Sequence, residues 1–245
     1  MLCKMEAVIP KIIHYCWFGP AEFSDKVKYC MKSWEKVLID YKFILWTEDN
    51  FDFSQSAFAR QAYENKKYAF VSDYVRIWAL EKYGGIYLDT DIEVLKPFDD
   101  LLYEEAVFGT DDLGELTAFM ASIPHHPIFK EILSLYDSMS FIKKDGSYNE
   151  VVNNKWMQEI LYHRGYVQEN RTQYLENAVI YPCEYFHAKS LLSGKEYVSS
   201  KTYCIHHHTL LWVSTYTRII RFMRLHVLIP IMGEKLYMKI AKKLR

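Results

Sequence analysis

Hydrophobic and polar positions follow two different periods in the first hundred residues. Continuous apolar runs at 11–19 and 41–50 predict buried strands. Between them, apolar residues at helical spacing follow Ser24, which predicts a capped helix over 25–38. Two more helical segments, 54–67 and 69–85, lead to Gly84-Gly85 and a third strand over 85–98. This alternation predicts an α/β fold with a mostly parallel sheet.

The second half of the chain is less regular. We expect strands at 106–110, 117–122, 177–186 and 201–212, and helices at 126–139 and 149–165. The last segment predicts two helical pieces interrupted at Pro230 and Gly233. The pattern therefore predicts one domain over residues 1–214 and a helical tail over residues 215–245.

Charge separates the tail from the rest. The 245-residue chain has a net charge of −1, which excludes a nucleic-acid binder on electrostatic grounds. The tail contains eight basic residues, and Glu234 is its only acidic residue. We expect an amphipathic basic helix attracted to an anionic membrane surface. The alternative is a helix packed on the body with a solvated basic face.

Cysteine usage and hydropathy indicate the compartment. Five cysteines without CxxC spacing make disulfides and a structural zinc improbable. The N-terminal residues lack the long apolar core of a signal peptide, and no apolar stretch is long enough to span a bilayer. We expect a cytoplasmic protein, peripheral on the inner face of the cytoplasmic membrane.

Two aspartates, Asp89 and Asp91, follow the apolar start of the third predicted strand. The carboxyl ends of strands in such sheets form the ligand crevice. Two carboxylates that point the same way repel each other unless a cation lies between them, and Mg²⁺ or Mn²⁺ suits oxygen ligands and phosphate. The spacing therefore predicts a metal–diphosphate site, with an exposed acidic turn as the alternative.

Two other groups support a site at this edge. Asp73 and Arg76 share one helix face, where they could bind sugar hydroxyls and phosphate or form a simple ion pair. In the run His206-His207-His208, strand alternation places the first and third on one face. One of them could complete an Asp-Asp-His metal shell, or the run could be a structural histidine cluster.

Three stretches resemble a known family: IPKIIHYCWFG, SDYVRIWALEKYGGIYLDTDIEVLKPFD and YCIHHHTLLWVS. In this order they resemble glycosyltransferase family 32, the DXD-containing sugar transferases of bacterial capsular polysaccharide synthesis. The chain is also similar to the glucosyltransferase domain of large clostridial toxins. The resemblance implies a GT-A fold, Rossmann-like, and metal-dependent transfer of a hexose from a nucleotide sugar with retention of configuration.

The resemblance also implies roles for residues of the first two stretches. Trp17 would stack on the donor base, although a core tryptophan is the alternative. Asp73 and Arg76 would hold the donor sugar, and Tyr87 and Asp89 would lie near the ribose and the metal.

The remaining roles fall on the motif's second aspartate and on the third stretch. Asp91 would be the main metal ligand, and of the paired His206 and His207 the latter is the preferred ligand. Trp212 would close over the diphosphate. Leu211 departs from the family, which usually has serine before that tryptophan, so the C-terminal lid could differ here.

Sequence alone does not identify a nucleophile. Asp111, Asp112 and Glu115 lie in the right region, but no spacing selects one, and a front-face mechanism needs none. The predicted function is transfer from a nucleotide sugar, UDP-linked by expectation, to a capsular, lipopolysaccharide-type or lipid-linked glycan with Mn²⁺ or Mg²⁺. The alternatives are a metal-dependent hydrolase and a non-catalytic nucleotide-sugar binder.

Overall fold

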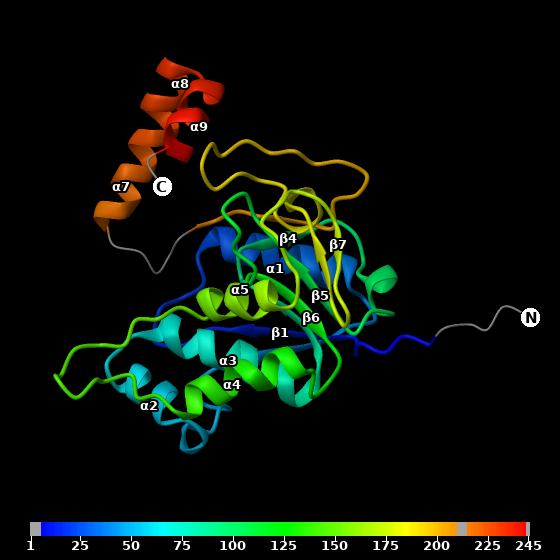
Figure 1. The fold of residues 1–245 in the computed structure, drawn as a ribbon, viewed down its shortest axis with the longest axis vertical. Helices are drawn as coiled ribbons and strands as arrows, with labels where there is room; N and C mark the ends of the chain where they lie inside the picture. The colour runs from blue at the N-terminus through cyan, green and yellow to red at the C-terminus, as the bar shows by residue number, and fades with distance from the viewer. Residues whose placement is uncertain (1–5, 210–214, 244–245) are drawn as a thin grey trace, which may run out of the picture.

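A seven-stranded sheet forms the centre of the molecule (Figure 1). The computed structural model describes residues 6–209 and 215–243. Strand order in the sheet is β2-β1-β3-β6-β5-β8-β7, and a two-stranded sheet pairs β4 with β9. The strands are β1 Ile12–Cys16, β2 Lys42–Trp46, β3 Gly85–Leu88, β4 Ile92–Val94, β5 Ala106–Gly109, β6 Phe119–Ser122, β7 Gln173–Tyr174, β8 Val179–Tyr181 and β9 Cys204–His206.

Strand directions confirm a mostly parallel sheet. The β1–β2, β1–β3 and β5–β8 pairs are parallel, whereas β6 runs antiparallel to both β3 and β5, and β7 runs antiparallel to β8. Strands β2, β1, β3, β5 and β8 therefore point in one direction. Their carboxyl ends lie along one edge of the sheet, where the aspartates were expected.

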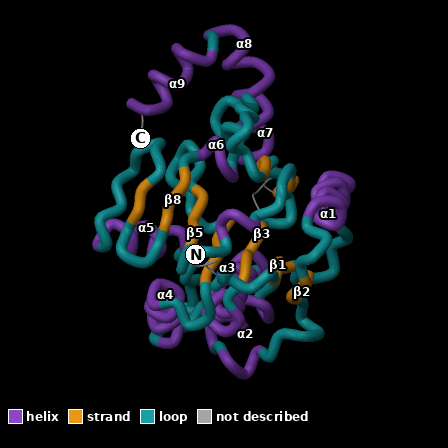
Figure 2. Tube along the Cα trace, turned by 90° about the vertical axis from the view of Figure 1, so that its right-hand side faces the viewer, coloured by secondary structure: helices purple, strands orange, loops and turns teal. Residues whose placement is uncertain are grey.

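Helices cover both faces of the sheet. Figures 1 and 2 place α2, α3 and α4 on one face and α1 on the other, and each face has its own apolar core. The helices are α1 Asp25–Val37, α2 Ala57–Glu64, α3 Tyr68–Tyr83, α4 Pro127–Asp137, α5 Asn153–His163, α6 Cys183–Phe186, α7 Thr215–Met223, α8 Ile229–Met232 and α9 Glu234–Lys243. Short 3₁₀ turns lie at Phe53–Gln55 and Asp99–Leu101.

Local signals at helix ends are confirmed. Ser24 caps α1, and its side chain accepts a hydrogen bond from the Val27 amide. Gly84 and Gly85 end α3 with φ values of 61° and 95°. A Cβ on Gly85 would lie 2.7 Å from the Ile12 carbonyl oxygen, so only glycine allows β3 to start this close to β1.

The prediction of one strand over 85–98 is wrong in a way that matters for the site. Strand β3 ends at Leu88, and the chain turns at Asp89–Asp91, where the Ile92 amide donates to the Asp89 carbonyl over 3.1 Å. Strand β4 then leaves the main sheet and pairs antiparallel with β9, which sets Ile92 opposite His206. The Trp34 indole on α1 donates to the Ile92 carbonyl at 2.6 Å and holds this new direction.

Three other segments differ from expectation. The strand predicted over 177–186 stops at Tyr181, because Pro182 follows and begins the turn into α6. The short strand β7 was not predicted. Pro230 does not end the helix, because Leu228 and Ile229 keep helical dihedrals, but a π-helical turn, Arg224–Leu228, directly precedes it.

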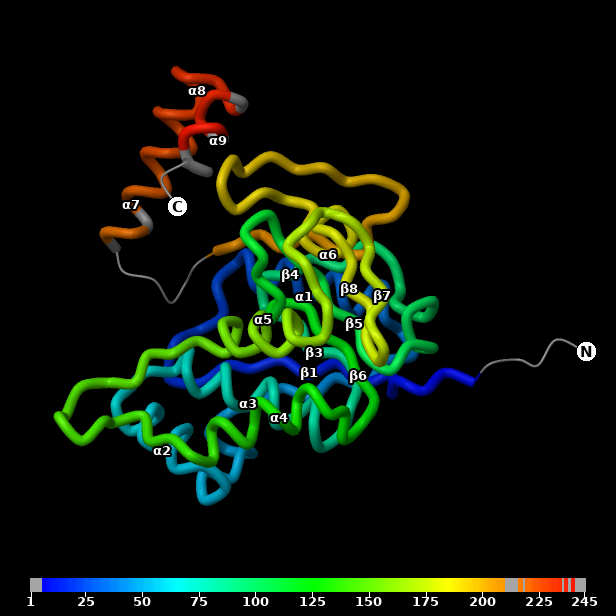
Figure 3. Tube along the Cα trace, viewed as in Figure 1, coloured from blue at the N-terminus to red at the C-terminus, as the bar shows by residue number. Residues whose placement is uncertain are grey.

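The tail consists of α7, a π-helical turn (η3, Arg224–Leu228), α8 and α9, with the break at Gly233. Figure 3 shows it at one end of the molecule, beside the loop that precedes β9. Arg224 donates to the Leu191 carbonyl at 2.9 Å, and Lys195 pairs with Glu234 at 3.6 Å. Among the described helices, none has the length and apolar character needed to cross a bilayer. The boundary at 214/215 stays a prediction.

Candidate functional site

The turn between β3 and β4 brings three candidate metal ligands together. Asp89, Asp91 and His206 each offer one ligand atom, and these atoms all lie within 4.8 Å of one another. The His206 Nε2 atom lies 3.2 Å from Asp91 Oδ1. The two aspartates come from the end of β3, and the histidine comes from β9, which the β4–β9 pairing places opposite.

Asp91 is held as a charged carboxylate. Its Oδ2 accepts hydrogen bonds from the Thr209 amide at 2.7 Å and the Thr209 hydroxyl at 2.8 Å. Burial acts to raise the pKa of Asp91, but His206 and Thr209 outweigh it and hold the pKa well below its usual range. Burial likewise acts to lower the pKa of His206, but the Asp91 charge outweighs it and raises that pKa.

Arg76 connects the candidate sugar-binding aspartate to the metal group. Its guanidinium lies 3.3 Å from Asp73 and 3.1 Å from Asp89, and it donates to the Thr117 carbonyl at 3.0 Å. The Tyr87 ring lies against it, 4.6 Å from centroid to guanidinium carbon. This buried cation therefore orients two of the carboxylates predicted for donor binding.

Burial makes both of these carboxylates hard to ionise. It raises the pKa of Asp73 to about 6, although Arg76 acts in the opposite direction. Burial also raises the pKa of Asp89 against the same arginine. A cation bound here would relieve the repulsion among the carboxylates, which is the arrangement expected of a site that holds a divalent ion.

The geometry favours His206 over His207 as the ligand, although the sequence preferred His207. His207 directly follows β9, and its Nε2 lies 2.8 Å from Glu93. Glu93 in turn accepts a hydrogen bond from Tyr29 at 2.7 Å. His206 is the histidine beside the aspartates.

Two further histidines surround His206. The His187 Nδ1 atom lies 3.2 Å from His206 Nδ1, and the His208 ring lies 3.9 Å from the His206 ring between centroids. His208 also contacts the Lys189 carbonyl through Nε2 at 3.1 Å. Without an ion, His206 Nε2–H donates to Asp91. With His187 Nδ1 accepting from His206 Nδ1–H, Nε2 would be the atom that gives its lone pair to a bound ion.

The aromatic candidates occupy different environments. Trp17 follows β1 at the same sheet edge, is partly exposed, donates to the Ala21 carbonyl at 2.6 Å and packs on Phe23. Tyr87 is buried, and its hydroxyl donates to Asp89 at 3.0 Å, so it supports the site from behind. Trp212 lies outside the described residues, as does Leu211.

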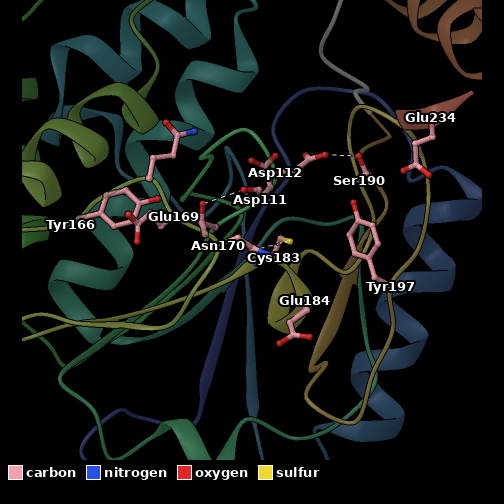
Figure 4. A pocket seen from close by; sticks show the side chains of 12 residues that line it. Asp111, Asp112, Tyr166, Glu169, Asn170, Cys183, Glu184, Ser190, Tyr197 and Glu234 are labelled. Carbon is pink, nitrogen blue, oxygen red and sulfur yellow. Dashed lines mark hydrogen bonds between the residues drawn. The ribbon is translucent and has the colours of Figure 1, made fainter. Parts of the chain in front are cut away.

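A cavity of about 670 Å³ lies where β5 and β8 end, and residues that follow both strands line it (Figure 4). Asp111 and Asp112, two of the three nucleophile candidates, line it. Asp111 Oδ1 accepts hydrogen bonds from the Leu113 and Glu115 amides at 2.8 and 2.9 Å, and Asp112 binds the Ser190 hydroxyl. Both carboxylates therefore have structural partners.

Sequence reasoning missed several members of the site. His187 and Thr209 contact His206 and Asp91 through tertiary packing, and no local pattern singles them out. Asn153 donates to the Asp73 carbonyl at 2.9 Å from α5. Thr117 accepts a hydrogen bond from Arg76 through its backbone carbonyl. Because every residue type has this group, the sequence could not indicate the contact.

Comparisons with known proteins agree with this geometry. Residues 24–108 match a family model described as a glycosyltransferase sugar-binding region containing a DXD motif. Inositol phosphoceramide mannosyltransferase 2 of Schizosaccharomyces pombe is 34% identical over 137 residues, covering 52% of this chain and 38% of that protein. Mannosyl phosphorylinositol ceramide synthase SUR1 of Saccharomyces cerevisiae is 34% identical over 146 residues, covering 55% and 37%. The chain thus spans less than two fifths of these relatives.

Two more similarities extend over longer stretches. An uncharacterized glycosyltransferase, L373, of Acanthamoeba polyphaga mimivirus is 25% identical over 200 residues, which cover 75% of this chain and 77% of that protein. The solved structure of PaToxG glycosyltransferase superposes with a TM-score of 0.51 at 19% identity, over 63% of this chain and 69% of that one. The GT-A fold prediction is confirmed. The match of residues 24–108 to this family model and the similarity to the two fungal relatives support the prediction of a transferase.

Proposed function

We propose that this protein is a divalent-metal-dependent glycosyltransferase that moves a hexose from a nucleotide sugar to a lipid-linked or cell-surface glycan. One observation carries the proposal: Asp89, Asp91 and His206 converge within 4.8 Å at the edge where parallel strands end. Two carboxylates and an imidazole form a donor set that fits Mn²⁺ or Mg²⁺. The family match over this segment supports a sugar donor.

When bound, the ion would neutralise the leaving diphosphate of the donor as a Lewis acid. Asp89, Asp91 and His206 would hold it. Arg76 keeps the Asp73 carboxylate fixed, and Asp73, with 13% of its side chain exposed, accepts hydrogen bonds from donor sugar hydroxyls. Trp17, partly exposed at the end of β1, stacks on the donor base, uracil by expectation.

We also propose retention of configuration by a front-face mechanism. A double displacement needs a free carboxylate beneath the anomeric carbon. Backbone amides engage Asp111 Oδ1 and a serine hydroxyl engages Asp112, and neither carboxylate is among the groups that converge at the metal group. In the front-face route, the leaving diphosphate oxygen accepts the acceptor proton, and the chain only orients both substrates.

A membrane-bound acceptor fits the tail. Its apolar residues are unusually exposed: Tyr216, Ile219, Ile220, Phe222, Met223, Leu228, Ile231, Leu236 and Ile240. Apolar side chains interspersed with lysine and arginine are typical of interfacial helices on anionic lipid. The names of the two fungal relatives describe transfer to, or synthesis of, a ceramide lipid. We place the enzyme on the cytoplasmic face of a membrane, in cell-surface polysaccharide or glycolipid synthesis.

The test is nucleotide release from a panel of UDP-linked and GDP-linked hexoses with Mn²⁺ or Mg²⁺. We expect release from one donor, sensitive to EDTA and reduced at least about 100-fold in Asp91→Asn, because this change removes a charged ligand. The exposed Asp40→Asn serves as the matched control and keeps wild-type release. Cleavage of phosphate esters without donor preference would point to a hydrolase instead. Donor binding without release from any donor would point to a non-catalytic binder.

A further inference from the structure

The cavity beside the metal group has walls from five parts of the chain. Residues after β5 and β8, the loops at 166–170 and 190–197, and α9 contribute its lining (Figure 4). Its volume, about 670 Å³, is large enough for one or two sugar units.

The cavity shares a wall with the metal group. His208, whose ring stacks near His206, contacts the Lys189 carbonyl, and the next residue, Ser190, donates to Asp112 inside the cavity. One short segment therefore separates the two sites. A ligand in the cavity would therefore lie near the metal group.

The lining is polar and acidic. None of the described residues that line it is basic, and its carboxylates come from Asp111, Asp112, Glu169, Glu184 and Glu234. The three glutamates form ion pairs with Arg171, Lys201 and Lys195 outside the lining. The two aspartates accept hydrogen bonds only from hydroxyl and amide groups within the described part of the chain. Within the described part of the chain, no ion pair therefore offsets the charges of these two aspartates.

One acceptor in the lining lacks a partner. Asp111 is 6% exposed, and its Oδ2 has no hydrogen-bond donor among the residues that the structure describes. A buried carboxylate oxygen without a donor is costly, and a hydroxyl from a ligand would satisfy it. The neighbouring amides of Gln168 and Asn170 and the rings of Tyr166 and Tyr197 supply further hydrogen bonds and flat apolar surface.

We propose that this cavity is the acceptor site, that it binds an uncharged sugar unit through its hydroxyls, and that it excludes a phosphorylated one. The inference rests on the proposed function, because it assigns the second substrate of the same reaction. Sugar hydroxyls donate to carboxylates and pair with amides, whereas a phosphate would meet Asp111 and Asp112 as like charges. The acceptor class thus differs from the phosphate-bearing lipid in the fungal relatives' names.

Binding by the full-length chain, without metal or donor, tests this inference. Ligand-observed NMR titration compares matched pairs: methyl α-glucoside with glucose 1-phosphate, and methyl α-mannoside with mannose 1-phosphate. We expect at least one glycoside to bind, with its phosphate partner at least about tenfold weaker. Equal or tighter binding of the phosphates that Tyr197→Ala weakens overturns the proposal, as does no glycoside binding at 50 mM, roughly the upper limit for a weak sugar site.

Variants locate the site. Asp112→Asn should weaken glycoside binding and reduce the discrimination against phosphate, since it removes one of the two uncompensated charges. Tyr197→Ala should weaken glycoside binding several-fold, while Tyr174→Ala, on an exposed tyrosine outside the cavity, should not. Glycoside binding unchanged in both cavity variants would also overturn the proposal. The nucleotide-release assay is independent of these measurements, so failure of the acceptor site and failure of the proposed function are distinguishable.

Discussion

Replacing Arg76 by methionine tests the electrostatic design of the site without requiring any substrate. The Arg76 side chain is 10% exposed, and its guanidinium contacts Asp73, Asp89 and the Thr117 carbonyl within 3.3 Å. Arg76→Met keeps most of the side-chain volume but leaves two largely buried carboxylates without their cation. Removing one partner of a buried ion pair costs about 3–5 kcal/mol, against a total stability of about 5–15 kcal/mol for a folded domain. We therefore expect a loss of about 3–5 kcal/mol.

Urea denaturation in EDTA measures this change, since a bound divalent ion could replace the lost charge. Arg164→Met is the matched control: Arg164 pairs with Glu131 at 2.6 Å, but both side chains are at least a third exposed. That surface pair contributes about 0–1 kcal/mol. Adding Asp73→Asn to Arg76→Met should recover part of the loss, because it removes an unpaired charge. A cost below about 1 kcal/mol for Arg76→Met, or strict additivity in the double variant, would refute the reasoning.

Three further predictions concern the histidines and the cavity. His206→Asn should weaken Mn²⁺ binding about 10–100-fold, as measured by calorimetry. His207→Asn should change Mn²⁺ binding little, because His207 binds Glu93. A larger loss in His207→Asn than in His206→Asn would contradict the ligand assignment. His187→Phe removes the acceptor at His206 Nδ1 and should weaken Mn²⁺ binding about tenfold, while His187→Asn should retain most of it; equal losses would argue against tautomer control. Burial raises the pKa of Asp111 from 3.8 to about 6, so the folded state binds the proton of Asp111 more tightly than the unfolded state does. The stabilisation from this proton is fully present below pH 3.8 and is lost as the pH rises to about 6. The free energy of unfolding should therefore fall by about 3 kcal/mol over this range. Asp111→Asn should remove that fall from the pH profile of unfolding, and an unchanged profile would show that Asp111 is not its source.

Local chemistry was enough to predict much of the framework. The Ser24 cap, the Gly84-Gly85 stop and the helices over α1 to α5 follow from side-chain spacing and backbone preferences within a few residues. The position of Asp89 and Asp91 at the carboxyl edge followed from the alternation of strands and helices along the chain. The strand predicted over 85–98 did not hold, because apolar alternation continues through the turn although β4 belongs to a different sheet.

By itself, the sequence determined the α/β alternation and the aspartate pair at the end of a buried strand, since both depend on contacts between near neighbours in the chain. Only the tertiary structure decided which histidine joins that pair, because the pairing of β4 with β9 turns His206 toward Asp91 and His207 toward Glu93. The same holds for His187 and for the acidic cavity, whose walls come from segments far apart in sequence. Strand register and packing between distant segments depend on the whole fold, so a local pattern carries no record of them.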